Sequence, residues 1–158
     1  MPDVTLLEYP DYDTVLYILR NLRSFDQIEA NAMSMSDDPI QWAAQIISSG
    51  PFQWVALYGE EPVATFGAVP RWPAVWSTWC LGTALFPHVA LSVSRHIKRV
   101  MLPAVLMAGM QRADAFVVED YQQAHRWMRT IGATREARLA NWGKNGETFV
   151  SYIWLRET

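Results

Sequence analysis

Side chains that could carry out chemistry are sparse in this 158-residue sequence. The three histidines, His88, His96 and His125, lack the spacing of metal ligands, so we expect surface or helix-capping roles for them and no metal site. Cys80 is the single cysteine, which excludes a disulfide framework and a cysteine zinc site. Its strand neighbours include no base, so we expect Cys80 to be a small apolar core residue and not a nucleophile.

Two pairs of acidic residues follow predicted strands. Glu60 and Glu61 lie in a Gly-Glu-Glu turn, where exposure to solvent is expected. Glu119 and Asp120 could bind a ligand at the mouth of the sheet, although Asp120 more simply suits the cap of the next helix. Neither pair forms a catalytic set, so no catalytic residue is assigned.

The helix that follows Asp120 is the most informative segment of the chain. Residues at three- and four-residue spacing place one apolar face along it: Ala124, Trp127, Met128 and Ile131. Gly132 then supplies the left-handed conformation that commonly ends a helix. An apolar strand at 115–118 precedes this helix, and an alternating stretch begins at Thr134.

Four consecutive features together resemble the closing motif of the GNAT acetyltransferase fold. They are this strand, a helix with alanine three residues before an aromatic residue, a glycine and a second strand. The elements expected elsewhere extend the resemblance over nearly the whole chain. Their order is β-α-α-α-β-β-β-α-β-α-β-β, a mixed α/β sheet with helices on both faces. We expect strands at residues 4–8, 52–58, 62–69, 75–81, 115–118, 137–142 and 148–155, and helices that begin near residues 10, 24, 38, 87 and 121.

Four short patterns predict how particular elements begin, bend or end. Ser24 begins a capping-box pattern for a short helix through Ile28, and Asp38-Pro39 is a cap followed by proline at the first helical position. Pro103 lies inside the long helix expected at 87–108 and predicts a kink. Asn145-Gly146, between the strands expected at 137–142 and 148–155, is the strongest hairpin signal in the chain.

In the GNAT family, a glycine-rich turn between the fourth strand and the long helix holds the pyrophosphate of acetyl-CoA with its backbone amides. The corresponding turn here is Leu81-Gly-Thr-Ala-Leu-Phe-Pro-His88, which has one glycine and lacks the family's Arg/Gln-x-x-Gly-x-Gly/Ala pattern. We therefore expect no cofactor. If acetyl-CoA does bind, the amides predicted to hold it are those of His88, Val89, Ala90 and Leu91.

The resemblance also implies an acid and a base for transacetylation. The family's acid is a tyrosine four residues before the helix-ending glycine, a position that is Met128 here. Its base is an acidic residue on the fourth strand, where this chain has Trp-Ser-Thr-Trp-Cys at 76–80. The main interpretation is therefore a catalytically degenerate GNAT fold, and the alternative is an N-acetyltransferase with a divergent acetyl-CoA site.

Length and composition favour one folded domain over residues 1–158, because 51% of the residues are hydrophobic and 18% are charged. Residues 1–61 contain ten acids and two bases, a net charge of −8, whereas residues 62–158 contain eleven bases and six acids, a net charge of +5. This asymmetry suits either complementarity within the domain or head-to-tail packing against other copies or partners. The bases form no dense run, which disfavours nucleic acid as a partner.

Eight tryptophans are many for this length, and they either fill the core or form a protein-binding surface. Alternation along the strand at 75–81 places Trp76 and Trp79 on opposite faces of the sheet. We predict Trp79 to be buried and Trp76 to be at least partly buried. Trp72 lies in the connection before this strand and is predicted to be exposed or covered by a partner, so Trp72 and Trp76 are the candidate interface residues.

A narrower resemblance covers roughly residues 75–135. The turn at 81–87, the segment from Arg95 to Pro103 and the segment from Ala124 to Ala133 resemble a small GNAT-like protein of short-tailed bacteriophages. It implies an internal virion or morphogenesis protein that acts by binding other virion proteins or copies of itself. The first residues lack the basic and apolar regions of a signal peptide, and no apolar run has the length of a membrane span, so we expect the virion or the host cytoplasm.

Overall fold

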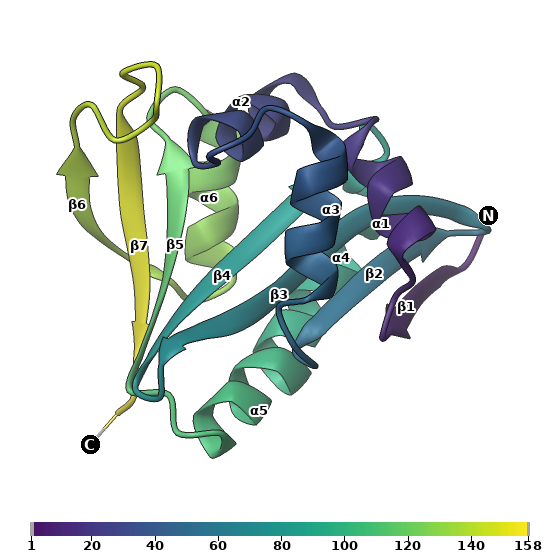
Figure 1. Ribbon diagram of the computed structural model, residues 1–158. Coiled ribbons are helices and arrows are strands. Elements are labelled where there is room, and N and C mark those ends of the chain that lie inside the picture. The colour runs from purple at the N-terminus through teal and green to yellow at the C-terminus, as the bar shows by residue number, and fades with distance from the viewer. Residues whose placement is uncertain (1, 158) are drawn as a thin grey trace.

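A seven-stranded mixed sheet forms the centre of the computed structural model, which describes residues 2–157 (Figure 1). The strands lie in the order β1-β2-β3-β4-β5-β7-β6, and every neighbouring pair is antiparallel except β4 and β5, which are parallel. Their bounds are β1 Val4–Glu8, β2 Gln53–Tyr58, β3 Glu61–Trp72, β4 Val75–Gly82, β5 Arg112–Val118, β6 Thr134–Leu139 and β7 Phe149–Leu155.

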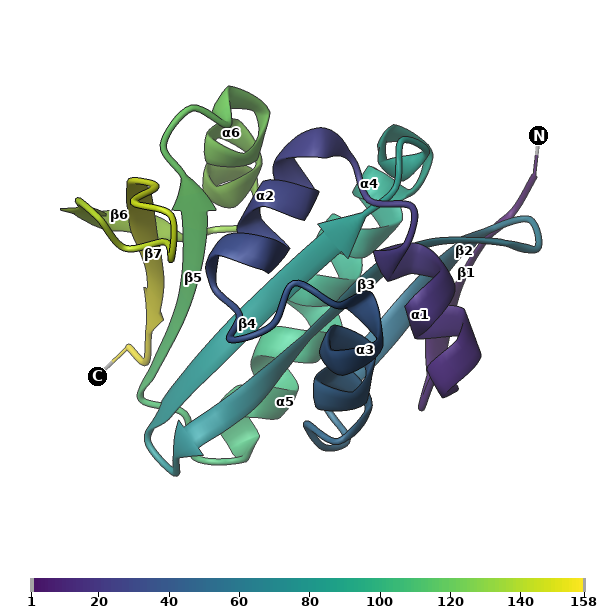
Figure 2. The ribbon, with the colours of Figure 1, turned by 45° about the horizontal axis from the view of Figure 1, so that its top comes forward.

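Helices cover both faces of this sheet (Figures 1 and 2). One face carries α1 Tyr12–Leu19, α2 Ser24–Ala32 and α3 Pro39–Ile47. The other face carries α4 Phe86–His96, the π-helical turn η1 Ile97–Met101, α5 Leu102–Met107 and α6 Gln122–Thr130. The predicted mixed α/β class and the predicted order of elements are confirmed.

Each face has its own apolar cluster. On the first face, α1 and α3 pack on β2 through Val15, Ile18, Leu19, Trp42, Ala43 and Val55. On the second face, the larger cluster includes Val89, Val93, Ile97 and Met101, which recur at helical spacing along α4 and η1. Among the helices of residues 2–157, none has both the length and the apolar character needed to cross a bilayer.

Local signals set several helix ends as predicted. Asp38 caps α3, because its Oδ1 accepts a hydrogen bond from the Ile40 amide at 2.9 Å. Gly132 ends α6 with φ +86°; its amide donates to the Arg129 carbonyl, and the next amide donates to the Met128 carbonyl. These two bonds form a Schellman motif, in which the left-handed residue is usually glycine.

One prediction about a helix start needs correction. Ser24 is the first residue of α2 and not its cap; the capping position is Arg23, which makes no side-chain bond to the helix end. Near Pro103, where a kink was predicted, the helical run consists of α4, the π-helical turn η1 and α5 in direct succession. Pro103 has no N–H to donate and its ring crowds the preceding turn, and the wider π turn immediately before α5 accommodates both effects.

The predicted hairpin is confirmed, because β6 pairs antiparallel with β7, but the bounds of its strands differ from those expected. β6 ends at Leu139 and β7 begins at Phe149, so residues 140–148 form a longer connection. This connection packs on the end of α2, where the Lys144 amide donates to the Ala32 carbonyl at 2.9 Å. Asn145-Gly146 still makes a turn, with Gly146 at φ +86°, but contacts with α2 determine the length of the loop.

We expect Gly132→Val to lower the free energy of unfolding by about 1–3 kcal/mol, because a β-branched residue is strongly disfavoured at positive φ. A side chain at this position would meet nothing closer than Trp154 Nε1 at 4.0 Å, so the cost is conformational and not steric. Gly132→Asn is the matched control, since asparagine tolerates this conformation. Equal melting temperatures for the two variants would contradict the assigned helix end.

Candidate functional site

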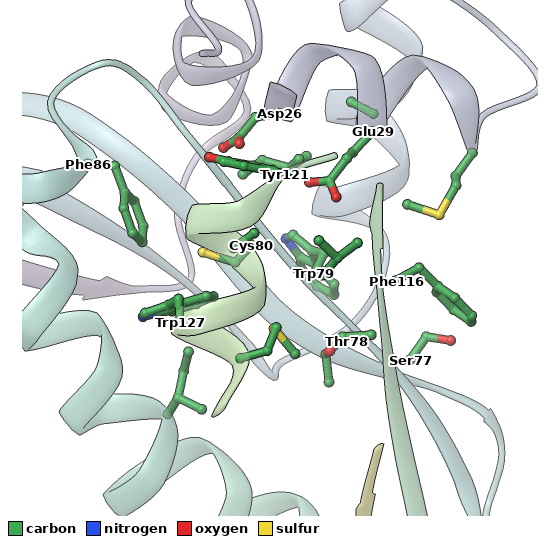
Figure 3. Close-up of a pocket in the computed structure, with 18 of the residues that line it drawn as sticks. Asp26, Glu29, Ser77, Thr78, Trp79, Cys80, Phe86, Phe116, Tyr121 and Trp127 are labelled. Carbon is green, nitrogen blue, oxygen red and sulfur yellow. The ribbon is translucent and has the colours of Figure 1, made fainter. Parts of the chain in front are cut away.

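The candidate site lies where β4 and β5 separate. The two parallel strands pair only from Val75 to Ser77, opposite Arg112 to Asp114, and then diverge. A cavity of about 840 Å³ occupies the opening and is lined from both faces of the sheet (Figure 3). Because backbone groups on facing strand edges must find partners when buried, the divergence requires new donors and acceptors beyond Ser77.

Helix α2 supplies two of these partners from a single turn. Asp26 Oδ2 accepts a hydrogen bond from the Gly82 amide at 2.6 Å, at the end of β4. Glu29 Oε2 accepts one from the Val118 amide at 2.8 Å, at the end of β5. Asp26 is 1% exposed and Glu29 is 8% exposed. The spacing of three residues puts both carboxyl groups on one helix face, so α2 joins the separated strand ends.

Arg23 completes the polar group at the mouth of the opening. Its Nη2 and Nε lie 2.8 and 3.3 Å from Asp26 Oδ2, and its Cζ lies 4.4 Å from the ring centroid of Phe86. The hydroxyl of Tyr121 points toward Asp26. Burial, followed by the negative charge of Asp26, raises the pKa of Tyr121, so this phenol stays protonated.

Burial also determines whether two other titratable groups at the opening are protonated. It raises the pKa of Glu29 to about 8, an effect that the Asp26 charge adds to and the Val118 amide partly offsets. Glu29 is therefore largely protonated at neutral pH. Burial likewise raises the pKa of the Cys80 thiol, which fits the predicted role of Cys80 as an apolar residue and leaves it a poor nucleophile.

The turn predicted as the cofactor cradle makes its hydrogen bonds within the protein. The Gly82 amide donates to the Asp26 carboxylate, and the Thr83 amide donates to the Val63 carbonyl. The remaining bonds stay inside the turn: Leu85 N to Thr83 Oγ1, Phe86 N to Thr83 O, and His88 N to Leu85 O. Pro87 has no amide hydrogen to donate. Of the amides from 82 to 88, therefore, only that of Ala84 has no bond among those that the structure describes.

The structure also shows why the turn keeps its single glycine. A Cβ at Gly82 would lie 2.8 Å from Cδ2 of Phe86, closer than such atoms approach. Gly82 additionally accepts a hydrogen bond at its carbonyl from the Arg23 amide at 3.0 Å. Gly82 thus serves the packing of α2 and Phe86 against the end of β4, and its amide does not face an anion.

Aromatic side chains close the space between α4 and α6 beside this turn. Trp127 on α6 donates from Nε1 to Ser94 Oγ on α4 at 2.8 Å, and its ring meets Phe86 edge-on at 5.6 Å. Met128, at the position of the family's catalytic tyrosine, is buried in the core. The groups that are present therefore do not fit acetyl-CoA in the manner of the family, since the protein itself engages most amides of the cradle, and Trp127 and Phe86 close the gap between the two helices beside the turn.

The other residues singled out in the sequence lie apart from this opening or at its edge. The helix residues His88, Val89, Ala90 and Leu91 form the second turn of α4, and among them Ala90 lines the cavity. His125 is buried, donates from Nε2 to the Glu119 carbonyl at 2.8 Å, and accepts at Nδ1 from the Tyr152 hydroxyl at 2.7 Å. Asp120 was expected to cap α6 with its carboxylate. The hydrogen bond that it accepts at the start of α6 is instead made by its backbone carbonyl.

The three tryptophans near β4 differ in burial. Trp72 is 57% exposed at the end of β3, and Trp76 is 4% exposed in the core, where it meets Phe52 edge-on at 5.1 Å. Trp79, predicted to be buried, is half-buried because it forms part of the cavity wall. Of the two candidate interface residues, Trp72 is the one that presents its ring to solvent.

Sequence reasoning missed the carboxyl groups that define the site. The helix predicted from Ser24 ended at Ile28, one residue before Glu29. The signal that was available is the spacing of three between Arg23, Asp26 and Glu29, which aligns three charged residues on one face of a helix. That alignment predicts a charged face, but the partners at Gly82 and Val118 follow only from the tertiary structure.

Comparison with solved structures identifies the fold. Ard1 from Thermoplasma volcanium matches with a TM-score of 0.75 and 11% identity over 98% of this chain and 99% of that chain. An acetyltransferase of the GNAT family from Bacillus anthracis matches with a TM-score of 0.64 and 10% identity over 98% and 96%. The acetyltransferase yncA from Salmonella typhimurium, solved with its cofactor acetyl-CoA, matches with a TM-score of 0.67 and 13% identity over 98% and 94%.

The protein therefore has the GNAT acetyltransferase fold. At these identities the likeness shows the fold and not the activity. The names of these structures fit an acetyltransferase better than a virion protein, and none of them points to a bacteriophage. No protein-family model and no curated protein matches the sequence.

The raised pKa of Glu29 makes the free energy of unfolding depend on pH. This carboxyl has a pKa of 4.5 as a free group and about 8 in the folded protein, so between these values the folded state holds an extra proton. Its contribution to stability is complete below about pH 4.5 and is lost as the pH rises through about 8. Glu29→Gln should flatten this part of the profile by on the order of a few kcal/mol, as urea unfolding at a series of pH values would measure.

Glu119→Gln is the control for this experiment, because Glu119 is a carboxylate near the same strand end whose pKa is lowered by its hydrogen bond with Arg138. It should leave the slope between pH 5 and pH 8, roughly the interval in which Glu29 titrates, as in the unaltered protein. Parallel profiles for the unaltered protein and Glu29→Gln would show that Glu29 is not the titrating group.

Proposed function

We propose that this chain uses the GNAT fold as a binding scaffold and does not carry out the family's transacetylation. The observation that carries the proposal is the turn at residues 82–88, where every amide N–H that the structure describes, except that of Ala84, already has a partner inside the protein. Met128 adds to it, because a thioether cannot donate a proton to a departing thiolate.

The partners we propose are proteins of a short-tailed bacteriophage particle, or further copies of this chain. The support comes from the narrower sequence resemblance over residues 75–135, from the opposite net charges of the two parts of the chain, and from the exposed ring of Trp72. Purified virions should contain the protein at fixed stoichiometry. Its absence from both virions and assembly intermediates would contradict this part of the proposal.

A second candidate function is an N-acetyltransferase with a divergent site. The names of the structural neighbours favour it, one of them having been solved with acetyl-CoA, as does the carboxyl of Glu29 in a cavity at the strand opening. In this case Glu29 would take the proton of an incoming amine, a role for which a pKa near the working pH is suited.

Calorimetry with acetyl-CoA separates the two candidates. We expect no binding tighter than about 100 μM, which corresponds to about −5.5 kcal/mol, because the cradle amides are engaged. Competition by free CoA and a fall in turnover in Glu29→Gln, with Glu119→Gln unchanged, would establish the acetyltransferase instead. The same titration with coenzyme A alone controls for heats that do not arise from the acyl group.

Replacing exposed and buried tryptophans tests the interface part of the proposal. Trp72→Ala should change the free energy of unfolding by less than about 0.5 kcal/mol, since the ring is mostly in solvent. Trp76→Ala should cost about 3–5 kcal/mol, because it removes a core ring. Urea unfolding measures both values, and sedimentation of the protein with its partners should show weakened assembly for Trp72→Ala. Unfolding of the isolated Trp72→Ala protein would place this residue in the core.

A further inference from the structure

The walls of the cavity between β4 and β5 present mainly carbon to its interior. The polar atoms of its tryptophans are already bonded elsewhere: Trp42 Nε1 to Ser36 O at 2.7 Å, Trp79 Nε1 to Thr65 Oγ1 at 3.4 Å, Trp127 Nε1 to Ser94 Oγ at 2.8 Å and Trp154 Nε1 to Ile131 O at 3.2 Å. Thr78 similarly donates from Oγ1 to the Asp114 carbonyl at 2.9 Å. A ligand therefore finds mainly ring faces and methyl groups inside, while the polar side chains of Gln45 and Gln123 lie at the exposed rim.

Small side chains are the reason that this space stays open. Ala90 on α4, Ala115 on β5, Ala124 on α6 and Cys80 on β4 all line the cavity. Protein interiors are otherwise packed with few voids, so a space of about 840 Å³ behind four small residues lies in the size range of ligand sites. Cavities with apolar walls exclude water and accept apolar molecules.

One end of the cavity holds a polar group that is directed inward. The Glu29 carboxyl points into the space above Trp79 (Figure 3). Its Oε2 is engaged by the Val118 amide, which leaves Oε1 for a ligand. Arg23, at the mouth, is committed to Asp26. The walls are thus mainly apolar, and Asp26 and Glu29 are the lining residues with a buried charged or polar side chain in the part of the chain that the structure describes.

We propose that this cavity binds an elongated, uncharged apolar ligand: an aliphatic chain whose one polar end, a hydroxyl or amide, bonds to the Glu29 carboxyl. A carboxylate end would meet the two acids Asp26 and Glu29, and Arg23 beside them is already paired with Asp26. An ammonium end would require ionised Glu29, which burial disfavours. The ligand needs none of the turn amides at 82–88, although it would occupy the cavity in which the second candidate function places the incoming amine.

Calorimetry of the full chain with 1-octanol tests the site directly. We expect saturable binding that Ala90→Leu and Ala124→Leu each weaken by at least about tenfold, because each adds three carbons to the cavity wall. Ala44→Leu, on the exposed side of α3 and away from the cavity, is the matched control and should bind as the unaltered protein does. Circular dichroism and melting curves identify any variant that fails to fold, and two separate filling variants keep the test decisive.

Two related ligands test the polar end. Octanoate and octylammonium should both bind at least about tenfold more weakly than 1-octanol at pH 7. No saturable binding of 1-octanol, or equal binding by the cavity-filling variants, would overturn the proposed site. Tighter binding of octylammonium, abolished by Glu29→Gln, would overturn the uncharged ligand class and assign the cavity to amines.

Discussion

Two backbone amides at the ends of β4 and β5 depend on the carboxyl groups of a single helical turn. A parallel pair of strands that separates inside a protein exposes N–H groups on both facing edges, and each buried donor without a partner would cost about 1–3 kcal/mol. Asp26 and Glu29 remove that cost at Gly82 and Val118. The same two bonds fix α2 over the opening, and the position of α2 in turn defines one wall of the cavity and the closed form of the neighbouring turn.

The two carboxyl groups serve the same structural purpose in different electrostatic environments. Asp26 has Arg23 at 2.8 Å, and this ion pair lies against the rings of Phe86 and Tyr121. Glu29 has a backbone amide and no cation of its own, and it lies beside the charge of Asp26, so burial favours its neutral form. A pair of acids three residues apart thus combines one charged and one largely neutral member, with the neutral one facing the cavity.

The sequence alone was sufficient wherever a few adjacent residues decide the structure. Asp38-Pro39 and Gly132 act within one turn of their own helices, so the start of α3 and the end of α6 were predictable. The hairpin around Asn145-Gly146 was predictable too, but the length of its connection was not, because the connection also packs against Ala32, a residue far away in the sequence. The absence of a proton donor at position 128 could be predicted, because Met128 lies four residues before Gly132 in the sequence. The closure of the turn could not, since the side chain that occupies the Gly82 amide comes from a helix whose partners no local pattern indicates.

The two hydrogen bonds that hold the opening together also bear on the order in which the structure forms during folding. Asp26 and Gly82 are separated by 56 residues, and Glu29 and Val118 by 89 residues, so each bond closes a long loop of chain. Closing such loops lowers the conformational entropy of the chain before the bonds can form, whereas α2 itself needs only local contacts. The cavity is therefore a late product of folding that takes shape when strands from both parts of the chain are already in place. If these bonds form after the transition state, substitutions at Asp26 and Glu29 accelerate unfolding and leave the rate of folding nearly unchanged.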